Sequence, residues 1–245
     1  MQKRSWTTMM ENNDSDSFNP SDYSGDENSV QQAVQTKVTD GAGDVANPLG
    51  ELERPQIICV IGGPGVGKGT QCKKLADDLS AAHLSVGDLL RAEASRVLAE
   101  EGTDIVAIME DGKLVPKELV QEVLKRYVDQ KVQQGITRIL LDGFPRSMDQ
   151  MTLFESSGFK IKAVLFFQGS RKTLLDRVRK RAKTSGRVDD NDDTFDKRYQ
   201  GFLDESPEII RSSKQKKILW EVDCNRELGV IYEETMELVK HIFSG

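Results

Sequence analysis

Five short segments with the pattern of buried strands recur along the second part of this chain. They cover residues 57–61, 83–86, 139–141, 163–167 and 218–222. Between them, apolar residues fall three or four positions apart, as on one face of a helix; Cys72, Leu75, Ala76 and Leu79 are an example. Strands that alternate with helices predict an α/β fold with a five-stranded parallel sheet covered by helices on both faces. Ligands then bind at the carboxyl ends of the strands.

Residues 1–54 lack this periodicity and are rich in Asn, Ser, Asp and Gly. They contain four basic and ten acidic residues, which accounts for the net charge of −6 and leaves 30 residues of each sign in residues 55–245. We therefore predict a disordered acidic N-terminal tail without a specific role, followed by one domain at 55–245. A partner-binding or regulatory tail is the alternative. The balanced charge of the domain disfavours nucleic-acid binding.

Targeting signals and membrane spans are not expected. Lys3 and Arg4 are not followed by the apolar core of a signal peptide, and the acidic residues of the tail are atypical of a mitochondrial transit peptide. No apolar run approaches the roughly 20 residues that span a bilayer. Cys59, Cys72 and Cys224 lie far apart in apolar surroundings, without metal-ligand spacing. They suit core positions in a reducing compartment, and we expect a cytoplasmic protein, with the nucleus left open as an additional location.

The glycine-rich segment from Gly62 to Thr70 connects the first strand to the helix that follows it. Glycines let backbone N–H groups close on a ligand, and a helix N-terminus attracts anions. Lys68 adds a full positive charge. The segment is typical of a P-loop that holds a polyphosphate, although Gly69 separates the lysine from the hydroxyl of Thr70.

Two further segments carry candidate chemistry. Asp142 ends the third strand, where a P-loop protein places a carboxylate that organises Mg²⁺, and Arg146 and Gln150 follow it closely. A run of basic residues then precedes the acidic residues 189–193: Arg177, Arg179, Lys180, Arg181, Lys183 and Arg187. Such a run is either a solvated face or a lid that closes over phosphates, with Gly186 as a flexible point.

Several motifs together resemble the nucleoside monophosphate kinases, in particular the eukaryotic adenylate and UMP-CMP kinases. They are GGPGVGKGTQC at 62–72, HLSVGDLLR at 83–91, DGFPR at 142–146 with Gln150, and SGRVDDN at 185–191 with Lys197 and Arg198. The resemblance runs from about Ile57 to the C-terminus. It implies a P-loop NTPase fold with an NMP-binding arm at about 85–115 and a short lid at about 181–193. It also implies transfer of phosphate from ATP-Mg²⁺ to a nucleoside monophosphate, in a monomer.

The resemblance also implies roles for individual residues. The ATP phosphates would be held by the loop, by Arg181 and by the backbone at Arg226; the loop residues are Gly65, Val66, Gly67, Lys68, Gly69 and Thr70. Thr70 and Asp142 would hold Mg²⁺ through water. Arginines would face the acceptor and the transferring phosphoryl group, namely Arg91, Arg146, Arg187 and Arg198. The acceptor would further be bound by Val86, Lys113, Leu114, Val115, Gly143 and Gln150. The short lid lacks cysteines, so no zinc is expected.

The acceptor base remains open between a pyrimidine and adenine. Adenylate kinases typically carry Thr where Val86 stands, and the absence of that hydroxyl favours UMP or CMP. Gln150 suits adenylate kinases and also uridylate kinases. The segments 90–93 and 223–226 look more like uridylate kinases, so UMP with CMP is the preferred acceptor and AMP the alternative.

Two other classes are disfavoured. A P-loop GTPase would need an Asn-Lys-x-Asp motif, which the chain lacks. A non-catalytic scaffold would have lost a lysine or arginine of the set, and none is missing. No general base is required, because the attacking phosphate is already an anion, so neither His83 nor His241 is needed.

Overall fold

The computed structural model describes residues 54–183 and 190–244 in full, together with the backbone of residues 184 and 185. The predictions for the tail at 1–53, for Gly186 and for Arg187 lie outside these residues. None of the described helices has an apolar stretch long enough to cross a membrane.

The described residues form a five-stranded sheet in which every paired strand runs parallel, as the sequence predicts. The order is β2-β3-β1-β4-β5, and the strands are β1 (Gln56–Ile61), β2 (Ala82–Ser85), β3 (Arg138–Asp142), β4 (Ile161–Gln168) and β5 (Leu219–Asp223). Strand β1 is central and pairs with β3 and β4. Its apolar residues are almost completely buried, because helices cover both faces of the sheet.

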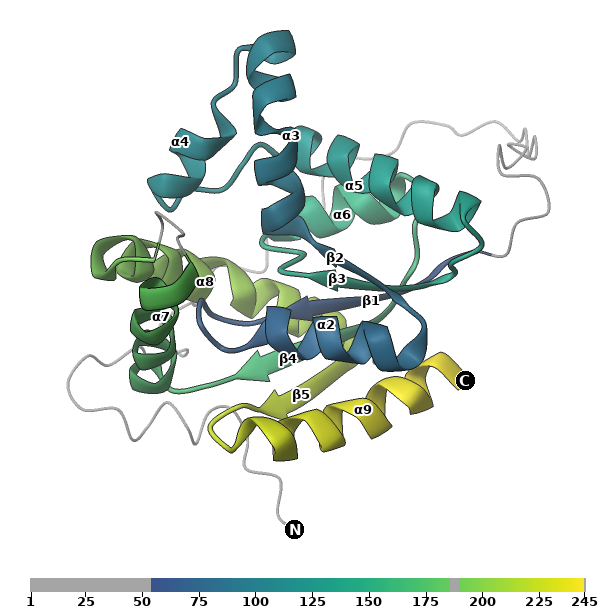
Figure 1. The fold of residues 1–245 in the computed structure, drawn as a ribbon. Helices are drawn as coiled ribbons and strands as arrows, with labels where there is room; N and C mark the ends of the chain where they lie inside the picture. The colour runs from purple at the N-terminus through teal and green to yellow at the C-terminus, as the bar shows by residue number, and fades with distance from the viewer. Residues whose placement is uncertain (1–53, 186–189, 245) are drawn as a thin grey trace, which may run out of the picture. The chain divides into compact units, whose positions relative to one another are not determined.

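Helices connect successive strands and cover the sheet (Figure 1). They are α2 (Lys68–Leu79), α3 (Val86–Glu101), α4 (Ile105–Glu110), α5 (Lys117–Gln133), α6 (Met148–Ser156), α7 (Arg171–Ser185), α8 (Asp192–Gln215) and α9 (Leu228–Ser244). Helices α2 and α9 pack on one face, where Leu75 and Val239 join Ile58 and Val60 in one hydrophobic core. Helices α5, α6 and α8 cover the opposite face (Figure 1).

The three cysteines are buried and free, as the sequence predicts. Cys59 lies within β1, Cys72 within α2, and Cys224 directly after β5. Cys224 donates its S–H to the carbonyl of Val222 at 3.6 Å. All three therefore occupy positions in the packed interior.

The strand register brings three chain segments to one edge of the sheet. Asp142 at the end of β3 pairs with Ser85 of β2 on one side and with Val60 of β1 on the other. The N–H of Gly143 donates to the carbonyl of Val60 at 2.9 Å. The glycine-rich loop, the start of α3 and the segment after β3 therefore leave the sheet side by side, which positions the site described below.

Helix α3 rises from the end of β2, and α4, which follows it, approaches the N-terminal part of α8 (Figure 1). The hydroxyl of Thr194 donates to the carbonyl of Glu110 at 3.2 Å, and the ammonium of Lys197 contacts the carboxylate of Asp111 at 2.6 Å. Lys113 also pairs with Asp111, and the two lysines lower the pKa of this carboxyl group to about 2. The turn after α4 is thus tied to α8 by charge and by hydrogen bonding.

The basic run of α7 faces acidic residues at the start of α8. Arg179 forms two hydrogen bonds with Asp192, and Arg171 pairs with Asp196 at 2.5 Å. Asn191 caps α8, because its side chain accepts the N–H of Thr194 at 2.8 Å. Part of the basic run is therefore neutralised within the protein, whereas Arg177, Lys180 and Arg181 line the cavity at the carboxyl ends of the strands.

Candidate active site

The glycine-rich loop turns sharply between β1 and α2. Gly65 has a φ of +81°, and a Cβ at this position would lie 2.4 Å from the carbonyl oxygen of Leu174 on α7. Gly67 has a φ of +104° and occupies the N-cap of α2. Because glycine offers no capping side chain, the first amide groups of α2 stay available to an anion. The turn thus requires glycine at both positions, for conformation and, at Gly65, also for space.

Lys68 is folded back over this turn. Its ammonium group donates hydrogen bonds to the carbonyls of Gly62 at 2.7 Å and Gly63 at 3.0 Å. Burial lowers the pKa of Lys68 to about 8, an effect that Asp142 opposes and that Arg146 and Arg198 reinforce. Four charged groups from different elements are therefore close enough to influence one another, which is the property expected of a phosphate site.

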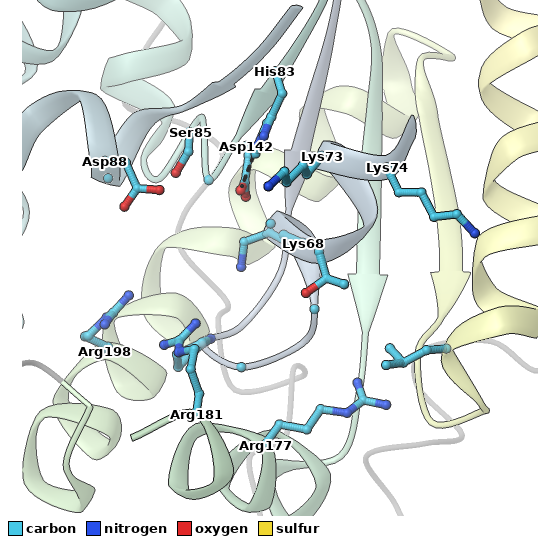
Figure 2. A pocket seen from close by; sticks show the side chains of 18 of the residues that line it. Lys68, Lys73, Lys74, His83, Ser85, Asp88, Asp142, Arg177, Arg181 and Arg198 are labelled. Atoms are coloured by element: carbon cyan, nitrogen blue, oxygen red, sulfur yellow. Dashed lines mark hydrogen bonds and ion pairs between the residues drawn. The ribbon is translucent and has the colours of Figure 1, made fainter. Parts of the chain in front are cut away.

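A cavity of about 900 Å³ opens above this loop at the carboxyl ends of the strands. Eleven of the predicted site residues line it: Gly65, Gly67, Lys68, Gly69, Thr70, Arg91, Asp142, Gly143, Arg146, Arg181 and Arg198. Figure 2 shows Arg181 and Arg198 approaching Lys68 from the side opposite to Asp142 and His83. Basic side chains from α2, α3, α7, α8 and the loop after β3 thus surround one volume.

Arg91 and Arg146 meet at the start of α3. A Cβ at Gly87 would lie 3.4 Å from Nη1 of Arg91 and 3.7 Å from Nη2 of Arg146. Nε of Arg146 also donates to the carbonyl of Gly143 at 3.2 Å, while Arg91 pairs with Asp88 at 3.0 Å. The glycine therefore leaves room for two guanidinium groups to converge, an arrangement that suits a phosphate.

Arg181 forms a bidentate pair with Asp190 across the predicted lid segment. Its Nε and Nη2 donate to the two carboxylate oxygens at 2.8 and 2.5 Å, and the Asp190 side chain is fully buried. This pair holds the Arg181 guanidinium at the cavity wall. Arg187, the other predicted lid arginine, lies outside the described residues.

A second cavity of about 230 Å³ adjoins the first, between the turn after α4 and α8. It is lined by the predicted residues Lys113 and Leu114, and it shares Lys68, Gly143, Arg146 and Arg198 with the larger cavity. Two adjoining cavities that share cationic side chains suit two ligands whose phosphates meet at these side chains.

Four of the predicted ligand residues are buried beside these cavities. Val66, Val86, Val115 and Gln150 are 1–6% exposed and line neither of the two cavities in the described part of the chain. The side-chain carbonyl of Gln150 accepts the N–H of Arg146 at 2.9 Å. Gln150 thus fixes the backbone that carries Arg146, whatever further contact it makes with a ligand.

Asp142 and Thr70 provide the oxygen ligands that Mg²⁺ prefers. A Cβ at Gly69 would lie 3.2 Å from Oδ2 of Asp142, so this carboxylate sits beside the start of α2. Thr70 lines the same cavity. The two residues fit a Mg²⁺ ion that is bound through water at the phosphates.

Arg226 is engaged away from the cavity. Its guanidinium pairs with Glu234 and donates to the carbonyl of Asp223 at 3.3 Å, so its side chain is directed toward α9. The predicted contact of ATP with the backbone at Arg226 does not involve this side chain, and it stays a prediction.

Two groups at the site have no assigned role in the sequence-based account. Arg177 donates to the carbonyls of Val66 at 3.1 Å and Cys224 at 2.9 Å, and so connects the glycine-rich loop to the segment after β5. Arg177 belongs to the basic run, but the charge pattern of the sequence did not distinguish its role from that of the other arginines and lysines in the run. His83 lines the large cavity and contacts Asp142, with Nε2 3.2 Å from Oδ2.

The fold and the cationic cavities together define a P-loop enzyme that acts on phosphorylated ligands, and comparisons with known proteins agree. A family model described as adenylate kinase matches residues 60–218. The uridylate kinase of Saccharomyces cerevisiae is 37% identical over 199 residues, which cover 81% of this chain and 98% of that protein. The UMP-CMP kinase of Lentinula edodes is 38% identical over 198 residues, 77% of this chain and 87% of that protein. Adenylate kinase 1 of Schistosoma mansoni is 38% identical over 184 residues, 75% of this chain and 92% of that protein.

The chain therefore belongs to the adenylate kinase family and is a nucleoside monophosphate kinase. The family resemblance and the fold class predicted from the sequence are both confirmed.

Proposed function

We propose that this protein transfers the γ-phosphoryl group of ATP-Mg²⁺ to UMP and CMP, giving ADP and a pyrimidine nucleoside diphosphate. The observation that carries the proposal is the convergence of cations around two adjoining cavities. Lys68, Arg146 and Arg198 line both of them, so the same positive charges would face the donor and the acceptor phosphates. Neither hydrolysis of ATP nor transfer of its adenylyl group to a phosphate would require a second nucleotide pocket that shares these charges.

The larger cavity would hold the donor. The amides of the loop and the N-terminus of α2 would bind the ATP phosphates, and Lys68 and Arg181 would neutralise them. Mg²⁺, held through water by Thr70 and Asp142, would supply further neutralisation of the phosphate charge. Arg177 would keep the loop in place, since it already bonds the carbonyl of Val66.

The smaller cavity would hold the acceptor nucleotide. Its phosphate would reach the larger cavity, where Arg91 and Arg146 would bind it, and Lys113 and Leu114 would lie against its base. An acceptor phosphate is already an anion, so catalysis consists of in-line positioning and charge neutralisation without a general base. Arg198 lines both cavities and is placed to stabilise the phosphoryl group during transfer.

The choice of a pyrimidine acceptor is supported by Val86 and by the relatives. Val86 has no hydroxyl group to hydrogen-bond an adenine, and it is buried at the start of α3. Relatives named uridylate kinase and UMP-CMP kinase cover most of the chain. Relatives named adenylate kinase match as well, so transfer to AMP is the second candidate.

The test is an assay of ADP release, coupled to a reporter enzyme, with AMP, UMP, CMP, dCMP and GMP as acceptors. Purified full-length protein is expected to turn over UMP and CMP with a higher kcat/KM than AMP. Lys68→Met serves as the control for contaminating kinases and should lose turnover while retaining its fold. Failure to transfer phosphate to any of the five acceptors would overturn the proposal, and preference for AMP would select the second candidate.

A further inference from the structure

Three side chains with metal-binding atoms meet at the floor of the larger cavity. Cys72 comes from α2, His83 from β2 and Asp142 from the end of β3. Their potential ligand atoms, one from each residue, all lie within 4.8 Å of one another. Phosphoryl transfer as proposed above uses Asp142 but gives neither the thiol nor the imidazole any task.

The chemistry of this set favours a borderline-soft metal ion over Mg²⁺. A thiolate and an imidazole are preferred by Zn²⁺, which also accepts a carboxylate, whereas Mg²⁺ takes oxygen ligands. Zinc bonds of roughly 2.0–2.3 Å would place tetrahedral ligand atoms about 3.5 Å apart. His83 Nε2 and Asp142 Oδ2 are already 3.2 Å apart, so movement of about 1 Å by the Cys72 side chain would complete three ligands.

Access to the cluster also suits a metal site. Cys72 is completely buried, while His83 and Asp142 line the cavity, so an ion can reach the cluster from the side of the phosphates. Figure 2 shows His83 directed at Asp142 from the strand above. Zinc sites that retain an open coordination position commonly have three protein ligands, and here that position would face the cavity.

The surrounding charges permit such an ion. Lys68 is one positively charged competitor in this cavity, but its ammonium group is directed to the carbonyls of Gly62 and Gly63. Zinc would replace the thiol proton of Cys72, which leaves to solvent. The resulting thiolate and the carboxylate of Asp142 balance the two positive charges of the ion. The site itself is then neutral, and exchange of the thiol proton for the ion raises the net charge of the region by one unit.

We propose that Cys72, His83 and Asp142 form a Zn²⁺ site at the floor of the phosphate cavity, and that its occupancy inhibits the enzyme. The sequence predicted no structural zinc in the lid, and this site lies elsewhere. Inhibition follows because zinc would occupy the carboxylate that organises Mg²⁺, so it should be competitive with ATP-Mg²⁺. The binding site stands on the geometry alone, whereas the inhibition rests on the proposed kinase function.

The binding test uses the full-length, nucleotide-free protein with a non-thiol reductant. Zinc is titrated against a competing chromophoric chelator, and Co²⁺ is used to detect a thiolate charge-transfer band. Wild type should bind one ion per chain. Cys72→Ala should lose the Co²⁺–thiolate band and bind zinc at least about 100-fold more weakly, a loss at the upper end of that seen for outer-shell changes. Cys224→Ala removes another buried thiol and should bind as wild type.

Two further measurements keep the result interpretable. Circular dichroism establishes that each cysteine variant is folded, and His83→Gln supplies an independent ligand deletion that should also weaken zinc binding. Equal zinc affinity in wild type and Cys72→Ala, or no stoichiometric binding in wild type, would overturn the proposal.

Activity is then measured at fixed free zinc in a metal buffer. Cys72→Ala should retain the turnover of wild type and require at least about 100-fold more zinc for half-inhibition. Zinc binding to an enzyme that it does not inhibit would refute the inhibitory role while leaving the kinase function intact. Zinc binding to a protein that transfers no phosphate would refute the kinase function while leaving the site intact.

Discussion

Replacing Gly65 with alanine tests how the glycine-rich loop is built. Two obstacles meet the added methyl group. The backbone at Gly65 has a φ of +81°, and the new Cβ would lie 2.4 Å from the carbonyl oxygen of Leu174 and 2.8 Å from Cγ2 of Val178. The carbonyl belongs to the backbone of α7 and cannot move independently of that helix. The loop must therefore shift away from α7.

Gly67→Ala is the matched control. Its φ of +104° imposes a comparable backbone strain, but a Cβ at Gly67 would meet no atom within 4 Å in the part of the chain that the structure describes. Backbone strain of this kind costs about 1–2 kcal/mol in both variants. The clash at Gly65 adds about 1–3 kcal/mol of overpacking. We therefore expect a loss of unfolding free energy of about 2–5 kcal/mol for Gly65→Ala and about 1–2 kcal/mol for Gly67→Ala.

Urea unfolding followed by circular dichroism measures both values, and steady-state kinetics with varied ATP measures the effect on the donor site. Gly65→Ala should also raise the KM for ATP more than the control does, because its loop is displaced from α7. Equal destabilisation of the two variants, or a greater loss in Gly67→Ala, would refute the reasoning.

Three further predictions concern the charges at the site. Arg146→Ala should lower kcat on the order of 10³-fold or more with little change in the thermal unfolding midpoint, as expected for a group that stabilises the transferring phosphoryl; near-normal turnover would contradict its role. Arg177→Met removes two charge-assisted bonds of about 1.5–3 kcal/mol each and should raise the KM for ATP about tenfold or more. Arg179→Met loses a surface pair on the same helix and should leave the KM for ATP unchanged. Equal effects of the two substitutions would refute the role of Arg177 in holding the glycine-rich loop. Because burial lowers the pKa of Lys68 to about 8, its ammonium loses the proton above that pH in the free enzyme, and kcat/KM for ATP should fall there. A profile that stays flat to pH 10 would exclude this assignment.

The fold was largely predictable because its strands are buried on both faces. Runs such as residues 57–61 and 163–167 are almost wholly apolar, and the structure places them in β1 and β4. Pro116, a residue type that favours the start of a helix, stands directly before α5. The order of the strands was not predictable from these runs, since local hydrophobicity says nothing of which strand lies next to which. The break between α3 and α4 at Gly102 was not predictable from these runs either, because apolar residues continue on both sides of it.

The site was predictable where chemistry is concentrated in short motifs. The glycine-rich loop, Asp142 and Arg146 are such cases, and the structure brings them to one cavity. Pairs that form between elements were not predictable. Asp190 neutralises Arg181 across the predicted lid segment, and Cys72 meets His83 only because α2 packs against β2 and β3. The spacing of the cysteines along the chain therefore did not indicate a metal site.

Competition between two acceptors tests the central claim most directly. Equal concentrations of UMP and AMP are incubated with limiting ATP labelled in its γ-phosphate, and the label in UDP and ADP is measured after separation. The account predicts that most of the label appears in UDP, and that Lys68→Met transfers none. Label found chiefly in ADP would contradict the pyrimidine assignment, and label remaining in ATP or released as free phosphate would contradict transfer between two nucleotides.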